Sequence, residues 1–257
     1  MKPKLTIVKI GGNVIDDPEM LQTVLKEFGQ LEGAKLLVHG GGKIASDISK
    51  RLKIPTQMVD GRRITDAATL EVVTMVYGGL VNKNVIAILQ SYGTDAIGLT
   101  GADANTIPAN KRPVNDIDYG FVGDIDTSHI NTERLSYLID GGLVPVFCAL
   151  THDNQGHLLN TNADTMASSL AIALSEGYDT ELIYCFEKNG VLLDVEDDNT
   201  LIRELNYLHF QQLKDDGVIH QGMIPKLDNA FLAKRQGVNV TVKHALNLTS
   251  PLGTSLL

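Results

Sequence analysis

The chain has 257 residues, of which 43% are hydrophobic and 21% are charged, and its formal net charge is −9. This apolar content is enough to fill a core, which excludes a disordered chain. The acidic balance disfavours a nucleic-acid partner, because non-specific nucleic-acid binding needs a basic surface.

The sequence shows no signal for export or for a membrane. Its first residues, MKPKLTIVKIGG, are a few charged residues followed by a predicted strand, which is not the pattern of a signal peptide. No apolar run approaches the roughly 20 residues of a membrane span. Cys148 and Cys185 lie in apolar runs, which predicts two buried free thiols rather than a disulfide framework. We therefore expect a cytoplasmic protein with no membrane partner.

The first third of the chain alternates between strands and helices. Residues 4–10 and 34–40 form apolar runs that predict buried strands, each ended by glycines. Between them, Asp17 and Pro18 are typical of a helix start, and apolar residues then recur at helical spacing. The pattern predicts a strand–helix–strand unit.

The glycines at 40–42 precede another predicted helix. A long helical stretch follows over about 66–90, and the pair Gly78–Gly79 predicts a break in it. Residues 93–130 are rich in turn residues and predict short strands, turns and a hairpin.

The second half continues the alternation. Its apolar runs and periodic segments predict strands at 143–150, 180–186 and 238–243, and helices at 131–142, 163–177 and 222–237. Pro225 is expected in the first turn of its helix, since an interior proline is costly. Asn189–Gly190 predicts a hairpin turn.

This order of elements predicts an α/β fold. Strands that alternate with helices form a mainly parallel central sheet with helices on both faces. Ligands bind such sheets at the carboxyl ends of the strands. Both glycine clusters, at 11–12 and 40–42, fall at those ends.

Each glycine cluster follows a strand, where backbone N–H groups and a helix N-terminus favour an anion. A single pair of this kind is usually just a tight turn. Two pairs, after the first two strands of one sheet, favour a phosphate or oxyanion site. Neither cluster matches the phosphate loop or the dinucleotide-binding fingerprint.

Two lysines occupy unusual positions. Lys9 lies inside an apolar strand, and lysine is rarely buried without a partner. It is either an edge residue facing water or an ammonium aimed at the mouth of a site. Lys226 follows Pro225 in the first turn of a helix, where cations are disfavoured. A phosphate or the carboxylate of Asp164 would explain that position.

Further polar residues are candidates for a ligand site. Asn160, Asn162 and Asp164 are spaced two apart before a helix, although Asp164 alone would also suit an N-cap. Arg62 and Arg63 lie between a turn and a helix. One of these two arginines is expected to be solvated, and the other can clamp a carboxylate with two hydrogen bonds.

Nine short motifs resemble those of the amino acid kinase family and occur in the same order. They are VKIGGN, HGGGKIASD, DGRRITD, GLVNK, GLTGAD, GFVGDI, NTNADTMA, GMIPKLDNA and GTSLL. Each motif alone is a modest signal, but the ordered set spans almost the whole chain and is highly specific. Within the family, the chain is most similar to the members that phosphorylate acylated glutamate.

The resemblance implies an open three-layer αβα sandwich and an enzyme that uses ATP and Mg²⁺. The implied reaction is phosphorylation of the γ-carboxylate of N-acetyl-L-glutamate, or of another N-acyl-L-glutamate such as the succinyl form, in arginine biosynthesis. It also implies one domain over 1–257. Its N-terminal lobe, about 1–177, would bind the acylglutamate, and its C-terminal lobe, about 178–257, would bind the nucleotide.

The resemblance also assigns roles to matching residues. Lys9 and Lys226 would bind the transferring phosphoryl group, and Asp164 would orient both lysines. The catalytic set is completed by backbone donors at Gly12 and Gly42. Since a carboxylate is already an anionic nucleophile, no general base is required, and positioning with charge stabilisation is sufficient.

The remaining implied roles concern the two substrates. Arg63 and Asn160 would hold the α-carboxylate of the acylglutamate. The implied acylglutamate-binding set is Gly41, Gly42, Arg63, Asn160 and Asn162, and the implied nucleotide-binding set is Lys9, Gly11, Gly12, Glu187, Gly190 and Lys226. Mg²⁺ would bridge ATP phosphates with few protein ligands.

Two departures from the family pattern stand out. The segment CFEKNGV has Phe186 in place of a small hydroxyl residue and Glu187 in place of an aspartate, close to the implied nucleotide site. The chain also begins at its first strand, without the extra N-terminal helix of the hexameric, arginine-inhibited members. A homodimer without strong arginine feedback is therefore expected.

Two other functions compete with this interpretation. An aspartate kinase-like enzyme would be expected to have an appended regulatory domain, which the sequence does not show. A non-catalytic ligand-sensing relative would be expected to have lost a charged catalytic residue. Lys9, Asp164 and Lys226 are all present, which favours an enzyme.

Overall fold

The side chains of strand β1 (Lys4–Ile10) point alternately to the two faces of a sheet. Leu5 and Ile7 pack into one hydrophobic core, whereas Val8 and Ile10 pack into a second. Successive side chains of a strand point to opposite faces, so this alternation places β1 between two layers. The structure, a computed structural model, describes residues 1–59, 62–219 and 222–257.

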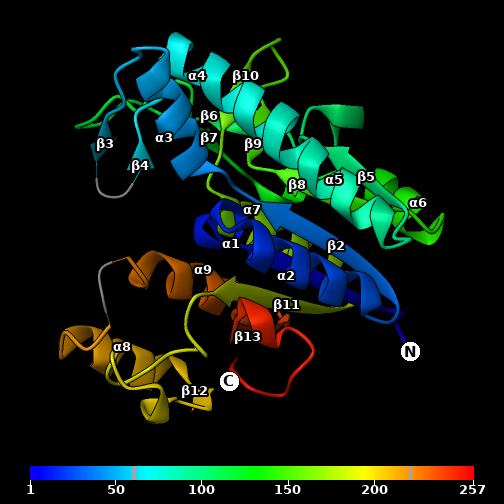
Figure 1. Ribbon diagram of the computed structural model, residues 1–257, viewed down its shortest axis with the longest axis vertical. Coiled ribbons are helices and arrows are strands. Elements are labelled where there is room, and N and C mark those ends of the chain that lie inside the picture. The colour runs from blue at the N-terminus through cyan, green and yellow to red at the C-terminus, as the bar shows by residue number, and fades with distance from the viewer. Residues whose placement is uncertain (60–61, 220–221) are drawn as a thin grey trace.

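β1 lies inside an eight-stranded sheet with the order β12-β14-β13-β11-β1-β2-β8-β5 (Figure 1). The strands from β5 to β13 in this order run parallel: β5 (Ala96–Leu99), β8 (Val144–Cys148), β2 (Ala34–His39), β1, β11 (Asp179–Phe186) and β13 (Asn239–His244). At one edge, β14 (Thr254–Leu256) runs antiparallel to β13 and pairs with β12 (Glu204–Leu205). The predicted mainly parallel sheet is confirmed.

Helices cover both faces of this sheet. One core packs the sheet against α1 (Gly12–Asp16), α2 (Pro18–Gln30), α3 (Gly42–Arg51), α4 (Ala67–Val73), the π-helix η1 (Thr74–Val81) and α5 (Asn82–Ser91). The other packs it against α6 (Thr132–Asp140), α7 (Ala163–Leu174), α8 (Tyr207–Asp215) and α9 (Ile224–Arg235). The three-layer αβα sandwich is therefore confirmed.

Three short antiparallel strand pairs lie outside the central sheet. They are β3 (Met58–Val59) with β4 (Arg62–Arg63), β6 (Asn110–Lys111) with β7 (Gly123–Asp124), and β9 (Leu150–His152) with β10 (Leu158–Asn160).

The helix starts follow the local signals of the sequence. The carboxylate of Asp17 accepts hydrogen bonds from the N–H groups of Glu19 and Met20 at the start of α2. Pro225 lies in the first turn of α9, as predicted. Asp17 thus pairs N–H groups that a helix start leaves free, whereas Pro225 has no N–H that would need a partner. Cys148 and Cys185 are buried free thiols, which confirms that prediction as well.

Two local predictions are wrong. Gly78 and Gly79 do not break the long helix, because the π-helical η1 joins α4 to α5 without interruption. Asn189–Gly190 does not form a hairpin turn either. Both neighbours of β11 are parallel to it, so the chain after Gly190 leaves the sheet instead of pairing back. The turn predicted before Arg62, at 60–61, lies outside the described residues.

Among the described residues, the segment Ala67–Ser91 is long and apolar enough to cross a membrane, and an 18-residue window within it has a mean hydropathy of 1.5. However, Val72, Val73, Val85 and Leu89 of this segment are fully buried against the sheet. The core helix of a soluble protein passes the same test of length and composition. Its hydropathy alone is therefore weak support for a membrane span.

Candidate active site

The two glycine turns lie next to each other at the carboxyl edge of the sheet. β1 and β2 pair in parallel, with Ile10 opposite His39. Both strands therefore end at the same edge of the sheet, and the glycine turns follow there side by side. Gly12 begins α1 and Gly42 begins α3. Two helix N-termini thus meet at one place, where free N–H groups and helix dipoles favour an anion.

Gly41 has a conformation that favours glycine. Its φ is +152°, and a Cβ built there would lie 3.0 Å from Cδ1 of Tyr77. Tyr77 lies within the π-helix η1, a widened turn of a kind that often occurs at functional sites. No sequence pattern indicates this contact, because an apolar π-helical segment has the same pattern as a regular helix.

His39 forms a hydrogen bond with Gly40, the first glycine of the second turn. It is fully buried, with Nδ1 2.8 Å from the carbonyl oxygen of Gly40 and Nε2 3.0 Å from the side-chain nitrogen of Asn82. The Asn82 amide donates to Nε2, so the imidazole is neutral and its Nδ1–H donates to Gly40. Burial lowers the pKa of His39 to about 4, which keeps the ring neutral at physiological pH.

Lys9 lies on the same face of β1 as Leu5 and Ile7, the face that α7 covers. Its Nζ is 2.7 Å from Oδ1 of Asp164 in the first turn of α7. Lys9 is 5% exposed and Asp164 is 7% exposed, so the charges of this ion pair are largely removed from water. The edge-strand alternative for Lys9 is wrong, and Asp164 is the partner that its burial requires.

Lys226 approaches the same place from the other side. It is half-buried in the first turn of α9, and its Nζ lies 4.4 Å from the ring centre of Phe186. Burial is the main cause that lowers the pKa of Lys226, followed by the positive charge of Lys9, while Asp164 and Glu187 act in the opposite sense. Such a destabilised cation is suited to an anionic ligand.

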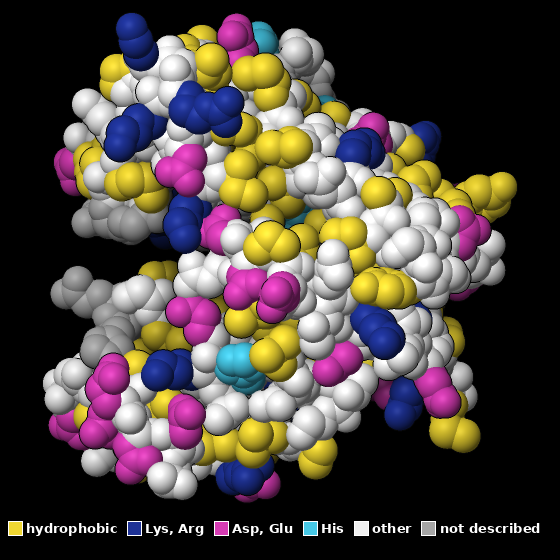
Figure 2. Space-filling view, in the orientation of Figure 1, with side chains coloured by type: hydrophobic (Ala, Val, Ile, Leu, Met, Phe, Trp, Pro, Cys, Tyr) yellow, Lys and Arg dark blue, Asp and Glu magenta, His cyan; other side chains and the backbone are white. Residues whose placement is uncertain are grey.

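A cavity of about 830 Å³ joins these groups. It lies where α3 and β4 face α9, and the space-filling view shows the molecule hollowed at this edge (Figure 2). Its lining includes all five residues of the implied catalytic set, Lys9, Gly12, Gly42, Asp164 and Lys226. The structure thus brings together residues from both ends of the sequence.

A second cavity of about 240 Å³ opens beside Gly41 and Gly42. Arg63, 8% exposed, lines it and donates from Nη2 to the carbonyl oxygen of Gly42 and to Oγ of Ser46, both at 2.8 Å. Its Nη1 is buried and has no hydrogen-bond partner among the described residues. Arg62 is exposed, so the prediction that one of the two arginines is solvated is confirmed.

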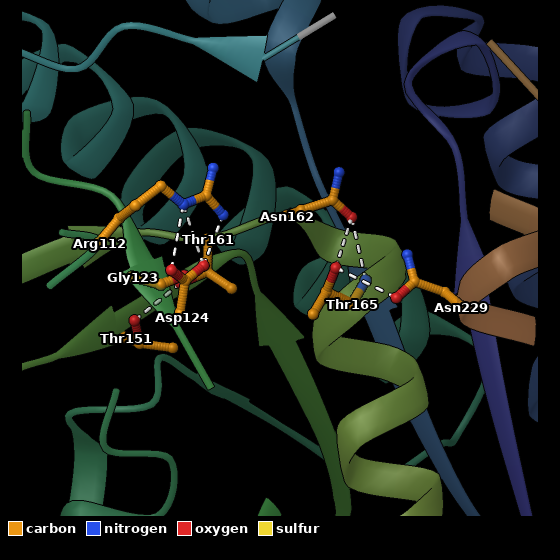
Figure 3. Close-up of polar contacts among 8 residues, drawn as sticks. All are labelled: Arg112, Gly123, Asp124, Thr151, Thr161, Asn162, Thr165 and Asn229. Carbon is orange, nitrogen blue, oxygen red and sulfur yellow. Dashed lines mark hydrogen bonds and ion pairs between the residues drawn. The ribbon is translucent and has the colours of Figure 1, made fainter. Parts of the chain in front are cut away.

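The two asparagines line the same cavity in different ways. Asn160 is buried at the end of β10 and donates from Nδ2 to Oγ1 of Thr65 at 3.0 Å. Asn162 is the N-cap of α7, and its Oδ1 accepts the N–H of Thr165 at 3.0 Å (Figure 3). The cap is therefore Asn162, which leaves the carboxylate of Asp164 free to pair with Lys9.

Arg112, which the sequence analysis missed, also lines this cavity. Its guanidinium binds the carboxylate of Asp124, with Nε 3.1 Å from both carboxylate oxygens. Figure 3 shows its other terminal nitrogen pointing away from Asp124, and this Nη1 has no hydrogen-bond partner among the described residues. The residues that flank Arg112 carry no signal for this role, because Arg112 reaches the site only through the β6–β7 hairpin.

The implied nucleotide-binding residues gather at a third, smaller cavity of about 160 Å³. It is lined by Lys9, Gly11, Gly12, Asn13, Val14, Cys185, Phe186, Glu187 and Lys226. The side chain of Asn13 donates to Glu187 there. Gly190 lies elsewhere: it is buried with φ +150°, and a Cβ built there would lie 2.5 Å from Oγ1 of Thr254. Its geometry fits packing against β14.

The described residues contain no group of three or more His, Cys, Asp or Glu side chains that could hold a metal ion. Among the described residues, Asp164 is the one carboxylate that lines the cavity of about 830 Å³, and it is paired with Lys9. A divalent cation at this site would therefore need oxygen ligands supplied mainly by the bound substrate.

Comparisons with known proteins agree with this geometry. A model of the amino acid kinase family matches residues 4–244. The acetylglutamate kinase of Cytophaga hutchinsonii is 56% identical over 240 residues, covering 93% of this chain and 90% of that protein. That of Bacteroides fragilis is 54% identical over 242 residues, covering 94% and 92%. The crystal structure of smu.665 from Streptococcus mutans has a TM-score of 0.82 at 26% identity, covering 98% of each chain.

Proposed function

Because the chain belongs to the amino acid kinase family, we propose that it transfers the γ-phosphoryl group of ATP to the γ-carboxylate of N-acetyl-L-glutamate, a step of arginine biosynthesis. A carboxylate oxygen forms a bond to the γ-phosphorus, and the bond from that phosphorus to the bridging oxygen of ADP breaks. ADP leaves, and the product is an acyl phosphate. No proton has to be removed from the nucleophile.

The observation that carries this proposal is the meeting of two lysines and two glycine turns in one cavity. In the proposed arrangement, the ammonium groups of Lys9 and Lys226 neutralise charge that develops on the transferring group. Backbone N–H groups at Gly12 and Gly42 donate to its oxygens and to the attacking carboxylate. Catalysis then consists of positioning and fixed charge, as phosphoryl transfer requires.

The acylglutamate is proposed to occupy the cavity beside Gly41 and Gly42. Arg63, whose Nη1 is buried without a partner, is suited to bind the α-carboxylate, together with the amide of Asn160. ATP is proposed to bind at the cavity lined by Gly11, Gly12 and Glu187. It would enter as MgATP, so that its phosphates supply most ligands of the cation.

A second candidate substrate is N-succinyl-L-glutamate. It differs from the acetyl form by one further carboxylate on the acyl chain. Arg62 and Arg112 both line the cavity beside Arg63, and Nη1 of Arg112 has no hydrogen-bond partner among the described residues. These two cations exceed what the α-carboxylate needs, and a carboxylate on the acyl chain would give one of them a partner.

We further propose that the protein is a cytoplasmic homodimer in which residues of about 1–177 bind the acylglutamate and residues of about 178–257 bind the nucleotide. The boundary falls just before β11, and both parts contribute strands to one sheet. Size-exclusion chromatography with light scattering tests the dimer directly.

The proposed substrate class is tested by a panel assay. ATP consumption is measured with N-acetylglutamate, N-succinylglutamate, glutamate and aspartate at equal concentrations. We expect turnover with one or both acylated forms and little with the free amino acids, whose ammonium group would lie near cationic side chains. Equal turnover of aspartate would favour an aspartate kinase-like enzyme, and binding without turnover would favour a ligand sensor.

A further inference from the structure

The ring of Phe186 lies near both cations of the candidate active site. Its centre is 4.4 Å from Nζ of Lys226 and 5.6 Å from Nζ of Lys9. Both distances are within the range over which an aromatic ring attracts a cation. The two lysines come from different layers of the structure, α9 and β1, so one ring connects them.

Phe186 is held firmly in this position. It is the last residue of β11 and is 7% exposed. Its ring is stacked on Tyr184, with the ring planes 3° apart and the centres 6.0 Å apart. The hydroxyl of Tyr184 in turn donates to the backbone carbonyl of Asp164. The two aromatic residues therefore link the lysines to the start of α7.

The ammonium groups of Lys9 and Lys226 share one cavity and repel each other. Among the described residues, only one of them has a carboxylate partner. Asp164 pairs with Lys9, whereas Lys226 has no ion-pair partner among the described residues. The groups that act on the charge of Lys226 are Lys9, Asp164 and Glu187, and the cationic Lys43, Arg62 and Arg112 line the same cavity. The electron-rich face of Phe186 opposes this excess of positive charge without occupying the place of an anionic ligand.

We propose that Phe186 is a positioning residue that holds the ammonium groups of Lys9 and Lys226 together for phosphoryl transfer. The inference rests on the proposed function for its kinetic consequences. A leucine at this position would fill similar space but would lack the quadrupole, so both cations would lose one favourable neighbour.

The test compares Phe186→Leu with Phe186→Tyr, which restores the ring. For the leucine variant we expect kcat to fall about 10-fold, equivalent to ~1.4 kcal/mol, while the KM for acylglutamate stays unchanged. The alkaline limb of its kcat profile should move to lower pH by about 0.5 unit, because Lys226 loses a neighbour that favours its charged form. The tyrosine variant should recover most of kcat and the wild-type profile.

Phe28→Leu is the matched control. Phe28 is fully buried and, like Phe186, has a lysine nearby, since Nζ of Lys35 lies 5.9 Å from its ring centre. It lies on α2, close to the opposite end of the sheet from the glycine turns. This variant should lose a comparable amount of thermal stability but keep the pH profile. An equal loss of kcat in both leucine variants, without a pH shift in either, would overturn the proposal.

A direct titration separates this inference from the proposed function. The lysines are reductively methylated with ¹³C-formaldehyde, and the pKa of Lys226 is followed by NMR, with Lys226→Arg used to assign its signal. The pKa should be lower in Phe186→Leu than in wild type, whatever the substrate. An unchanged pKa would contradict the role of Phe186, whereas a shifted pKa in a protein without acylglutamate turnover would contradict only the function.

Discussion

The Nζ of Lys9 lies 2.7 Å from Oδ1 of Asp164, and both side chains are buried at the carboxyl edge of the sheet. This ion pair joins the middle layer to α7 and fixes one cation beside both glycine turns. A buried pair contributes little net stability by itself, but removing one partner leaves an uncompensated charge. Loss of either partner should therefore lower the free energy of unfolding and also change the net charge of the active site.

Asp164→Asn should show both effects. We expect the free energy of unfolding to fall by ~3 kcal/mol, because Lys9 stays buried without its partner. We also expect kcat to fall by at least about 10²-fold, because the position of Lys9 is no longer fixed. Urea unfolding and steady-state kinetics measure the two quantities. Asp17→Asn, which keeps an N-cap on α2, is the control and should change neither greatly. Wild-type turnover in Asp164→Asn would refute the orienting role.

Lys226→Ala tests the cation on α9. If Lys226 contacts the transferring group, kcat should fall by about 10²-fold or more, with little change in the KM for acylglutamate. Lys234→Ala, in the last turn of the same helix, should retain kcat. Near-normal turnover in Lys226→Ala would reduce Lys226 to a surface lysine.

Arg63→Lys separates binding from chemistry. The α-carboxylate does not change charge during transfer, so its partner should affect KM rather than kcat. Lysine keeps the charge but loses the planar fork, and we expect KM for the acylglutamate to rise ~10-fold, which is ~1.4 kcal/mol of binding. KM for ATP should stay constant and kcat should change only a few-fold. A collapse of kcat at constant KM would mean that Arg63 acts on the phosphoryl group.

Gly12→Ala places a methyl group in the proposed path of the phosphoryl group. A Cβ built on Gly12 meets no protein atom within 4 Å, and Gly12 lines the two cavities that Lys9 and Lys226 also line. We expect an unchanged or slightly higher Tm, because alanine is the better helix former, and kcat/KM for ATP lowered at least ~10-fold. Gly79→Ala, which is equally unhindered, is the control. Full activity of Gly12→Ala would show that nothing approaches this glycine.

His39 should make the fold sensitive to acid. Its pKa is about 4 in the folded chain against 6.5 for an exposed imidazole, so the unfolded state binds the proton more readily between these values. Stability is therefore fully present above pH 6.5 and is lost as the pH falls towards 4, by ~2 kcal/mol between pH 7 and 5. Urea unfolding at several pH values should show this slope in wild type and a smaller one in His39→Gln. Equal slopes would mean that the pKa of His39 is the same in the folded and the unfolded chain.

Much of the catalytic set could be predicted from local patterns. Lys9 interrupts an apolar strand and shares the parity of Leu5 and Ile7, so its side chain had to enter the face that a helix covers. Pro225 fixed the start of α9 and hence the place of Lys226. Glycines after two strands marked the edge of the sheet at which the ligand site forms.

Other parts of the site depend on contacts that no local pattern reports. Tyr77 lies next to Gly41 from within the π-helix η1, and Arg112 lines the cavity from the β6–β7 hairpin. His39 ends strand β2, and no local pattern indicates that its two ring nitrogens contact Gly40 and Asn82. The hairpin expected at Asn189–Gly190 fails because β11 already has a neighbour on each side.

The most direct test of the central claim is to trap the product. The purified chain is incubated with MgATP, N-acetylglutamate or N-succinylglutamate, and hydroxylamine, which converts an acyl phosphate into a hydroxamate that mass spectrometry can identify. We predict a hydroxamate at the γ-carboxyl group, formed in a 1:1 ratio with ADP and nearly absent with Lys226→Ala. Release of ADP without any hydroxamate from either acylglutamate would contradict phosphorylation of the γ-carboxylate.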